Sequence, residues 1–135
     1  MWYPFELDFA NLGTCPVPEG NLENLANYQW LALGYKVDLR FRAYWDGAIK
    51  DDDQAFMDYL AVWCNGDKWL MDDAFSDSPY VAAKNPWDEY VNKCRTFNYS
   101  LIANALAKVT MTARDRYEQC ITGRLESPIT REETV

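Results

Sequence analysis

The stretch from Tyr35 to Ala43 constrains the fold most strongly, because apolar and charged residues alternate in it without a break. A period of two puts successive side chains on opposite faces of a β-strand. The two faces would be Tyr35, Val37, Leu39, Phe41 and Ala43 against Lys36, Asp38, Arg40 and Arg42. We therefore predict a half-buried strand over residues 35–43, in an antiparallel sheet with one solvated or partner-facing side.

Helical patterns flank this segment. Residues 21–33 have a moderate helical spacing that Gly34 would end. Residues 52–64 are more convincing, because acids that can cap the free amides come first. Phe56, Leu60 and Trp63 then form an apolar stripe that stops at Asn65-Gly66. Both segments are predicted to be helices.

The second half of the chain gives a longer helix and a weaker strand. Residues 86–107 are predicted to be a helix that begins with Pro86 at its first position, whereas residues 67–84 are predicted to be mainly loop. The pattern after Ala107 fits either a helix or a strand. We favour a strand from about Val109, because Val and Thr prefer strands.

These elements predict an α+β fold, with about three helices packed on a small, mainly antiparallel sheet. A chain of 135 residues with 49% hydrophobic and 16% aromatic residues can bury a core of its own. We expect a single domain over 1–135, with an aromatic N-terminal arm (about 1–10) and a polar C-terminal tail (about 126–135). Alternation in the arm makes it a candidate edge strand.

Composition excludes several kinds of catalytic site. The chain has no histidine, which removes the commonest general base and the usual serine or cysteine triads. Its six glycines are isolated, so it has no Gly-rich nucleotide-binding loop. Carboxylate pairs such as Asp72-Asp73 and Asp88-Glu89 remain, but such pairs usually lie at helix ends. We predict no enzyme activity and no cofactor.

Metal sites and disulfides have little support. Asp46 and residues 51–53 offer oxygen ligands, but their spacing does not fit a calcium-binding EF-hand. The four cysteines are widely separated, so a zinc site would need all four to converge. The four cysteines are Cys15, Cys64, Cys94 and Cys120. They could form up to two disulfides, with three possible connectivities, but we favour reduced and mostly buried thiols.

The charge of the chain is concentrated in its middle third. Residues 46–89 contain eleven acids and three lysines, a net charge of −8 that equals the charge of the whole chain. An acidic surface can simply keep a protein soluble, or it can engage a basic protein partner. We predict a partner-binding acidic face made of Asp51, Asp52, Asp53, Asp72, Asp73 and Asp77. The face would repel nucleic acid, so no direct nucleic-acid binding is expected.

Aromatic residues suggest a core and a docking arm. Phe56, Trp63, Trp69, Trp87 and Phe97 are expected to be buried. The first nine residues are unusually aromatic for a terminus, which predicts an arm that docks on a partner or on another copy of the chain. The residues of this arm are Trp2, Tyr3, Phe5 and Phe9.

The sequence thus predicts a non-catalytic interaction or assembly protein, such as a phage or mobile-element structural component, that can form homo-oligomers. One alternative is an acidic inhibitor that mimics nucleic acid, and another is a small-molecule binder or carboxylate enzyme with an aromatic pocket. No apolar stretch is long enough to span a membrane. The N-terminus does not resemble a secretory signal, which predicts a cytoplasmic or virion location.

Overall fold

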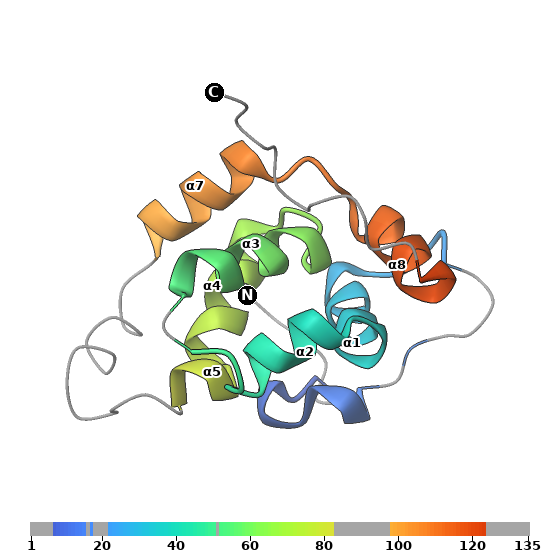
Figure 1. Cartoon of the computed structure of the whole chain (residues 1–135), viewed down its shortest axis with the longest axis horizontal. Coiled ribbons are helices and arrows are strands. Elements are labelled where there is room, and N and C mark those ends of the chain that lie inside the picture. The colour runs from blue at the N-terminus through green and yellow to red at the C-terminus, as the bar shows by residue number, and fades with distance from the viewer. Residues whose placement is uncertain (1–6, 16, 18–21, 51, 83–97, 124–135) are drawn as a thin grey trace.

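A computed structural model describes residues 7–15, 17, 22–50, 52–82 and 98–123 (Figure 1). All regular elements among these residues are helices, and none is a β-strand. The predicted α+β class, with its antiparallel sheet, is therefore wrong for the described part of the chain. Its elements in chain order are η1 (Phe9–Thr14), α1 (Asn27–Val37), α2 (Leu39–Trp45), α3 (Asp53–Trp63), α4 (Lys68–Asp77), α5 (Pro79–Ala82), α7 (Tyr99–Lys108) and α8 (Ala113–Thr122).

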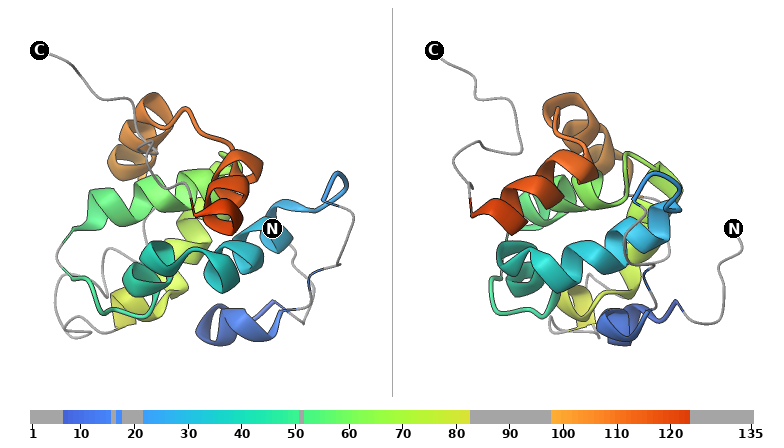
Figure 2. Two further views of the ribbon diagram at one scale, coloured as in Figure 1. Left: turned by 45° about the vertical axis from the view of Figure 1, so that its right-hand side comes forward. Right: turned by 90° about the vertical axis from the view of Figure 1, so that its right-hand side faces the viewer.

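Helix α3 lies at the centre of the arrangement. Helix α7 packs along one side of it, while α1 and α2 lie on the other side (Figure 2). Helix α4 follows α3 after a tight turn, and α8 contacts both α1 and α3. Element η1 packs beneath α1. Two sides of α3 are thus covered by helices that come from opposite ends of the sequence.

The predicted strand at residues 35–43 is the end of α1 followed by the start of α2. Asp38 separates the two helices with an extended backbone (φ −98°, ψ 99°), and its side chain caps α2 by accepting from the amides of Arg40 and Phe41. The predicted assignment of residues to a buried and a solvated face is wrong. Asp38, predicted on the solvated face, is 1% exposed, whereas Leu39, predicted on the buried face, is 72% exposed. The buried residues of α2 follow a helical period, because Tyr44 and Trp45 lie three and four residues after Phe41 and all three are buried.

Gly34 was expected to end the first helix, but α1 continues past it to Val37. The reason is packing, because a Cβ at this position would overlap the indole ring of Trp63. The glycine therefore lets the backbone of α1 approach α3 closely, and its helical conformation needs no special φ.

The predicted helix at 52–64 is confirmed by α3. Asp52 caps it by accepting from the amide of Ala55. The apolar stripe of Phe56, Leu60 and Trp63 is fully buried. The helix stops where expected, because Asn65 and Gly66 both have positive φ (52° and 71°).

The predicted loop at 67–84 is instead largely helical. Asp67 caps α4 by accepting from the amides of Trp69 and Leu70. The apolar residues of α4 recur at helical spacing, and the buried ones are Leu70, Met71, Ala74 and Phe75. Ser78 ends α4 and Pro79 begins α5, so these two residues form only the boundary between two helices. Trp69 was predicted to be buried and is 52% exposed.

The last two helices differ from the prediction in part. Helix α7 falls within the predicted helix 86–107, although residues 83–97 lie outside the described residues, together with Trp87, Phe97 and Cys94. Residues 109–112 link α7 to α8, with extended backbone at Val109 and Thr112, and Thr112 caps α8. A strand from Val109 into the following residues is therefore wrong, because Thr112 accepts from the amide of Asp115 and starts a helix instead.

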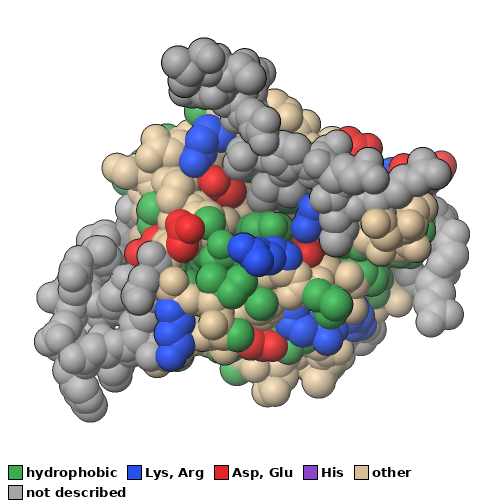
Figure 3. All heavy atoms as spheres, viewed as in Figure 1, with side chains coloured by type: hydrophobic (Ala, Val, Ile, Leu, Met, Phe, Trp, Pro, Cys, Tyr) green, Lys and Arg blue, Asp and Glu red, His purple; other side chains and the backbone are tan. Residues whose placement is uncertain are grey.

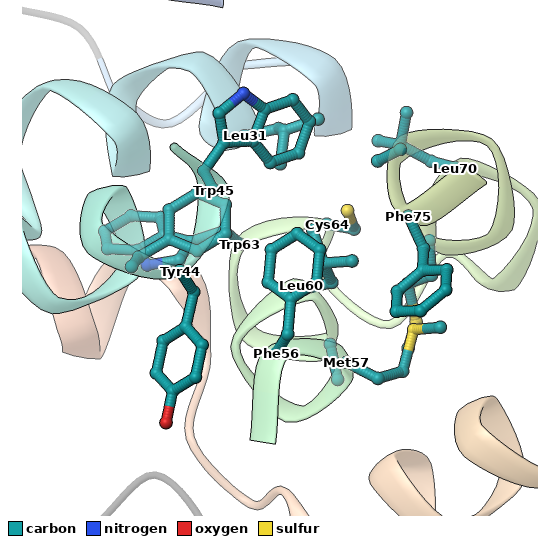
Figure 4. Close-up of a cluster of buried hydrophobic side chains, with 14 of the residues drawn as sticks. Leu31, Tyr44, Trp45, Phe56, Met57, Leu60, Trp63, Cys64, Leu70 and Phe75 are labelled. Carbon is teal, nitrogen blue, oxygen red and sulfur yellow. The ribbon is translucent and has the colours of Figure 1, made fainter. Parts of the chain in front are cut away.

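The core is a group of aromatic and aliphatic side chains that point toward one another from α1, α2, α3 and α4 (Figure 4). Phe41 lies in its middle, with its ring stacked on Phe56, Tyr59 and Trp63 at centroid distances of 6.4 Å each. Such ring pairs add to the stabilisation that comes from burial alone.

Candidate functional site

Helices α3 and α4 carry five of the predicted acidic residues. Asp52 caps α3 and Asp53 begins it, while Asp72, Asp73 and Asp77 lie between the middle and the end of α4. The start of α3 and the end of α4 meet because the rings of Phe56 and Phe75 are 5.6 Å apart. Asp51, the remaining predicted residue, lies outside the described residues.

Part of this acidity has a structural role. Tyr80 ties α5 to the start of α3, because its hydroxyl donates to Asp53 (2.7 Å) and accepts from the backbone amide of Asp52 (3.0 Å). Asp72 accepts from the amide (3.0 Å) and the side chain (2.8 Å) of Asn98, which precedes α7. These carboxylates join helices to one another.

The carboxylates of α4 also repel one another. The pKa of Asp77 is raised by partial burial and by the negative charges of Asp73 and Asp72. Spacings of one, four and five residues put these three side chains on one side of a helix. A cationic group of a partner would relieve the repulsion, so this side of α4 is the strongest part of the predicted acidic face.

The view in Figure 3 shows a different kind of surface. On this face the described acidic and basic side chains are interspersed with hydrophobic ones, so the face is not uniformly acidic. Hydrophobic side chains exposed on the described molecule include Leu39 and Trp69, together with Tyr99, Leu106 and Ile121. The acidity that the sequence predicts is therefore local and does not cover the molecule.

The basic side chains around α2 are largely engaged within the fold. Lys36 donates to the carbonyl of Cys15 (2.9 Å), and Arg42 donates to the carbonyls of Tyr35 (2.8 Å) and Lys36 (3.1 Å). Arg42 also stacks over the ring of Tyr35. The two hydrogen bonds of Arg42 satisfy backbone carbonyls near the end of α1. Arg40 remains exposed on α2, with its guanidinium over the ring of Tyr44.

A buried ion pair lies between α8 and the junction of α1 and α2. Arg116 is 4% exposed and donates from Nε and Nη2 to both carboxylate oxygens of Asp38, at 2.8 and 3.2 Å. The indole N–H of Trp63 donates to the same carboxylate at 3.1 Å. Asp38 thus joins four helices, because its carboxylate caps α2 and binds α3 and α8, while its backbone amide donates to the carbonyl of Gly34 and closes α1.

The surroundings of Arg116 act on its pKa in opposite directions. Burial alone would lower the pKa of Arg116, but its hydrogen bonds to Asp38 and the charge of Asp38 raise it. The guanidinium lies over the ring of Tyr59, whose pKa is raised chiefly by burial. The nearby thiol of Cys120 has its pKa raised to about 11 by burial and by Asp38. The ion pair was not predicted, because Asp38 was assigned to a solvated strand face.

Burial acts on the other described thiols as well. Cys15 and Cys64 are buried, and Cys120 is partly buried. Burial raises the pKa of the Cys64 thiol well above its ordinary value. Within the described ranges, no three metal-binding side chains lie close enough to hold an ion.

The N-terminal arm is described only at its end. Trp2, Tyr3 and Phe5 lie outside the described residues. Phe9 starts η1 and packs on the core, with its ring 6.3 Å from that of Trp45. This part of the predicted docking arm therefore contacts its own chain.

A cavity of about 240 Å³ opens beside the link between α7 and α8. It is lined by the end of α3, the turn after it, one residue of α7 and the link itself: Ala61, Asn65, Gly66, Leu106, Val109, Thr110, Met111 and Thr112. Its walls mix apolar side chains with the hydroxyls of two threonines and one amide. None of the described residues that line the cavity is ionisable, so these residues offer apolar and hydrogen-bonding contacts.

One comparison with known proteins identifies a similar domain. Residues 49–115 match the family model of the NrS-1 polymerase HBD domain. The match begins before α3, spans α3, α4, α5 and α7, and ends at the start of α8, which is just under half of the chain. It indicates a phage-like protein domain, in partial agreement with the predicted phage or mobile-element origin.

Neither the curated proteins nor the solved structures contain a match to this chain. Among the described helices, none combines the length and the apolar character needed to cross a membrane.

Proposed function

We propose that the chain is a non-catalytic helical interaction domain of a phage-type replication assembly, which docks on a basic surface of a protein partner. The observation that carries this proposal is the match of residues 49–115 to a domain of a polymerase. Proteins that handle nucleic acid present basic surfaces to the phosphates, and such surfaces can also receive carboxylates.

The docking surface in this proposal is the side of α4 that carries Asp73 and Asp77, with Asp72 beside them. Like charges four residues apart destabilise a helix, and the pKa of Asp77 is raised first by burial and then by the charges of Asp73 and Asp72. Arginine or lysine side chains of a partner would offset the repulsion among these charges. Carboxylate pairs at an interface rim chiefly accelerate association, so the docking should weaken steeply with added salt.

A nucleic-acid mimic would use the same partner surface in a different way, by occupying the site that binds phosphates. A mimic needs many carboxylates directed outward. Here Asp52, Asp53 and Asp72 accept hydrogen bonds from within the fold, which leaves fewer acids for a phosphate-like array. This observation favours docking beside the nucleic-acid site over replacement of nucleic acid.

The test uses a purified phage-type polymerase, mixed with the full chain and measured by size-exclusion chromatography with light scattering. A stable complex is expected. The variant Asp73→Lys/Asp77→Lys should weaken it by at least about tenfold, or about 1.4 kcal/mol. The matched control is Asp115→Lys/Glu118→Lys on α8, which makes the same change in net charge and should leave the affinity within about twofold.

A labelled single-stranded oligonucleotide separates the alternatives. By fluorescence anisotropy, the chain alone should leave the oligonucleotide free, and the polymerase should retain it when the chain is added. Displacement of the oligonucleotide would support the mimic. Direct, salt-sensitive binding by the chain alone would contradict the proposal, as would an α4 variant that behaves like its control.

A further inference from the structure

Helix α7 lies at the outside of the arrangement, where it packs along α3 (Figure 1). Two of its ten residues, Ile102 and Ala105, are buried, whereas seven of the eleven residues of α3 are buried. Burial of apolar surface is the main force that holds packed elements together, and α7 receives much less of it than the helix on which it packs. The attachment of α7 therefore depends strongly on polar contacts.

Polar contacts lie along the side of α3 that faces α7. Gln54 donates from Nε2 to the carbonyl of Leu101 (3.0 Å), and its Oε1 accepts from Nδ2 of Asn104 (3.3 Å). One turn further along α3, the carboxylate of Asp58 pairs with the ammonium of Lys108 at 3.2 Å. Gln54 and Asp58 are four residues apart, so they lie on one side of the helix. This side of α3 carries groups that water can solvate when α7 moves away.

The ion pair between Asp58 and Lys108 holds α7 only weakly. Asp58 is 6% exposed, with one carboxylate oxygen bound by Gln54 (3.0 Å) and the other by Lys108, whose side chain is 42% exposed. Removing a carboxylate from water is costly, and a single ion pair offsets that cost only in part. Both charges return to water when α7 leaves, so the pair adds little to the free-energy difference between the attached and the detached helix.

The start of α7 is fastened to α4. The amide and the side chain of Asn98 both donate to Oδ1 of Asp72, at 3.0 and 2.8 Å. An asparagine before the first turn of a helix usually accepts from an amide of that turn, but the Asn98 side chain makes no such bond. When α7 leaves α4, this side chain becomes free to cap its own helix. The detached helix thus recovers part of what it loses at Asp72.

The other end of α7 leads into the link to α8 and borders the cavity. Val109 ends the helix with an extended backbone (φ −76°, ψ 123°), and α8 begins with a cap of its own at Thr112. The cavity of about 240 Å³ is lined by Leu106 of α7, and by Ala61 and Gly66 from the end of α3 and the turn after it. An outward movement of α7 would therefore remove one wall of the cavity.

We propose that α7 is a lid, which opens from α3 and α4 as one unit about the link at residues 109–112. Helices α1 to α4 and α8 stay packed around the aromatic core in the open form. Opening breaks the bonds that Gln54, Asp58 and Asp72 make to α7, and it exposes the cavity at the end of α3. The link serves as the hinge, because its backbone belongs to neither helix.

Native-state hydrogen exchange of the full chain, measured by NMR, tests the lid. The amides of Ile102 and Val109 report on the two ends of α7, since they donate to the carbonyls of Asn98 and Ala105. Their protection factors should agree within about twofold and lie at least about a hundredfold below those of the slowest α3 amides. Protection that rises from both ends toward the middle of α7 would indicate fraying and would overturn the proposal, as would protection equal to that of α3.

Gly34→Ala separates the opening of α7 from global unfolding. The new Cβ disturbs the contact with Trp63, which persists whether α7 is closed or open. The substitution should therefore speed exchange in α3 by at least about fivefold and leave Ile102 and Val109 within about twofold of the unmodified chain. Equal acceleration in α3 and α7 would mean that α7 opens only when the whole chain unfolds, and would refute the lid.

Lys108→Met tests the polar attachment itself. It leaves the Asp58 carboxylate buried without its ion pair only while α7 is closed, so the α7 amides should exchange at least about fivefold faster. The matched control is Arg114→Met, because Arg114 is exposed and pairs with Glu118 within α8. It should leave α7 exchange within about twofold. The same α7 rates in both variants would contradict the proposal.

Discussion

The ion pair between Asp38 and Arg116 should dominate the stability of this fold, and Arg116→Met tests it. The substitution keeps most of the side-chain volume but leaves the Asp38 carboxylate with only the Trp63 indole and the two capping amides. Asp38 is 1% exposed, so water cannot replace the lost guanidinium. Breaking a buried pair from one side costs about 3–5 kcal/mol.

That loss is large against the total, since a domain of this size is stable by about 5–15 kcal/mol. Urea unfolding followed by tryptophan fluorescence measures it directly. With a slope of about 2 kcal/mol per molar urea, the midpoint should fall by about 1.5–2.5 M. The control is Arg114→Met on the same helix, because Arg114 is exposed and pairs with Glu118 at 3.7 Å. It should cost only about 0.3–0.5 kcal/mol.

A double-mutant cycle separates the pair from packing. In Asp38→Asn/Arg116→Met neither buried charge remains, and the amide oxygen can still cap α2. The double variant should therefore be less destabilised than the sum of the two single variants, by about 1–3 kcal/mol. Equal costs for Arg116→Met and Arg114→Met, or strict additivity in the cycle, would refute the claim that the fold depends on this charge pair.

Three further outcomes follow from the same contacts. Gly34→Ala should cost about 1–3 kcal/mol in urea unfolding, because its Cβ would overlap the Trp63 indole; Gly123→Ala, with open space around its Cβ, is the comparison for backbone strain alone. The pKa of Asp77 is raised in the folded state, so its protonated form is favoured there and its contribution to stability is lost as the pH rises through that pKa. Asp77→Asn should therefore raise the melting temperature at pH 7 and lose this advantage near pH 3, and a constant difference across that range would exclude the repulsion. With a pKa of about 11, only about one in a thousand Cys120 thiols is ionised at pH 8, so iodoacetamide should label it roughly a hundredfold more slowly than an unfolded cysteine by mass spectrometry.

The sequence predicted α3 correctly because several local signals agree there. The helix has a cap at Asp52, an apolar spacing of three and four residues, and a stop at Asn65-Gly66. Each of these signals depends only on residues close in the sequence, so the sequence pattern alone is enough to predict the helix. The acidic face predicted at 52, 53, 72, 73 and 77 stays a prediction, and the engagement of Asp53 and Asp72 within the fold depends on Tyr80 and Asn98, which no local pattern indicates.

The strand at residues 35–43 failed for a reason that no local rule contains. Asp38 looks like a solvated residue in an alternating pattern, but its buried partner is 78 residues away in α8. The alternation of apolar and charged residues arises because the end of α1 and the start of α2 meet at Asp38, which caps α2. The ion pair with Arg116 makes the burial of Asp38 possible. Only the aromatic pair Tyr44 and Trp45, just beyond the window, indicated the helical period of α2.

The boundaries of the family match and of the packing do not coincide. The match covers residues 49–115, yet Trp63 at the centre of that segment contacts Gly34 of α1, stacks on Phe41 of α2 and donates to Asp38 between them. Arg116, which completes the Asp38 site, lies one residue beyond the match. The matched helices therefore share their core with α1, α2 and α8. In this chain the matched segment is the centre of a larger helical unit, and the acidic residues of α4 are held by a scaffold that depends on residues outside the match.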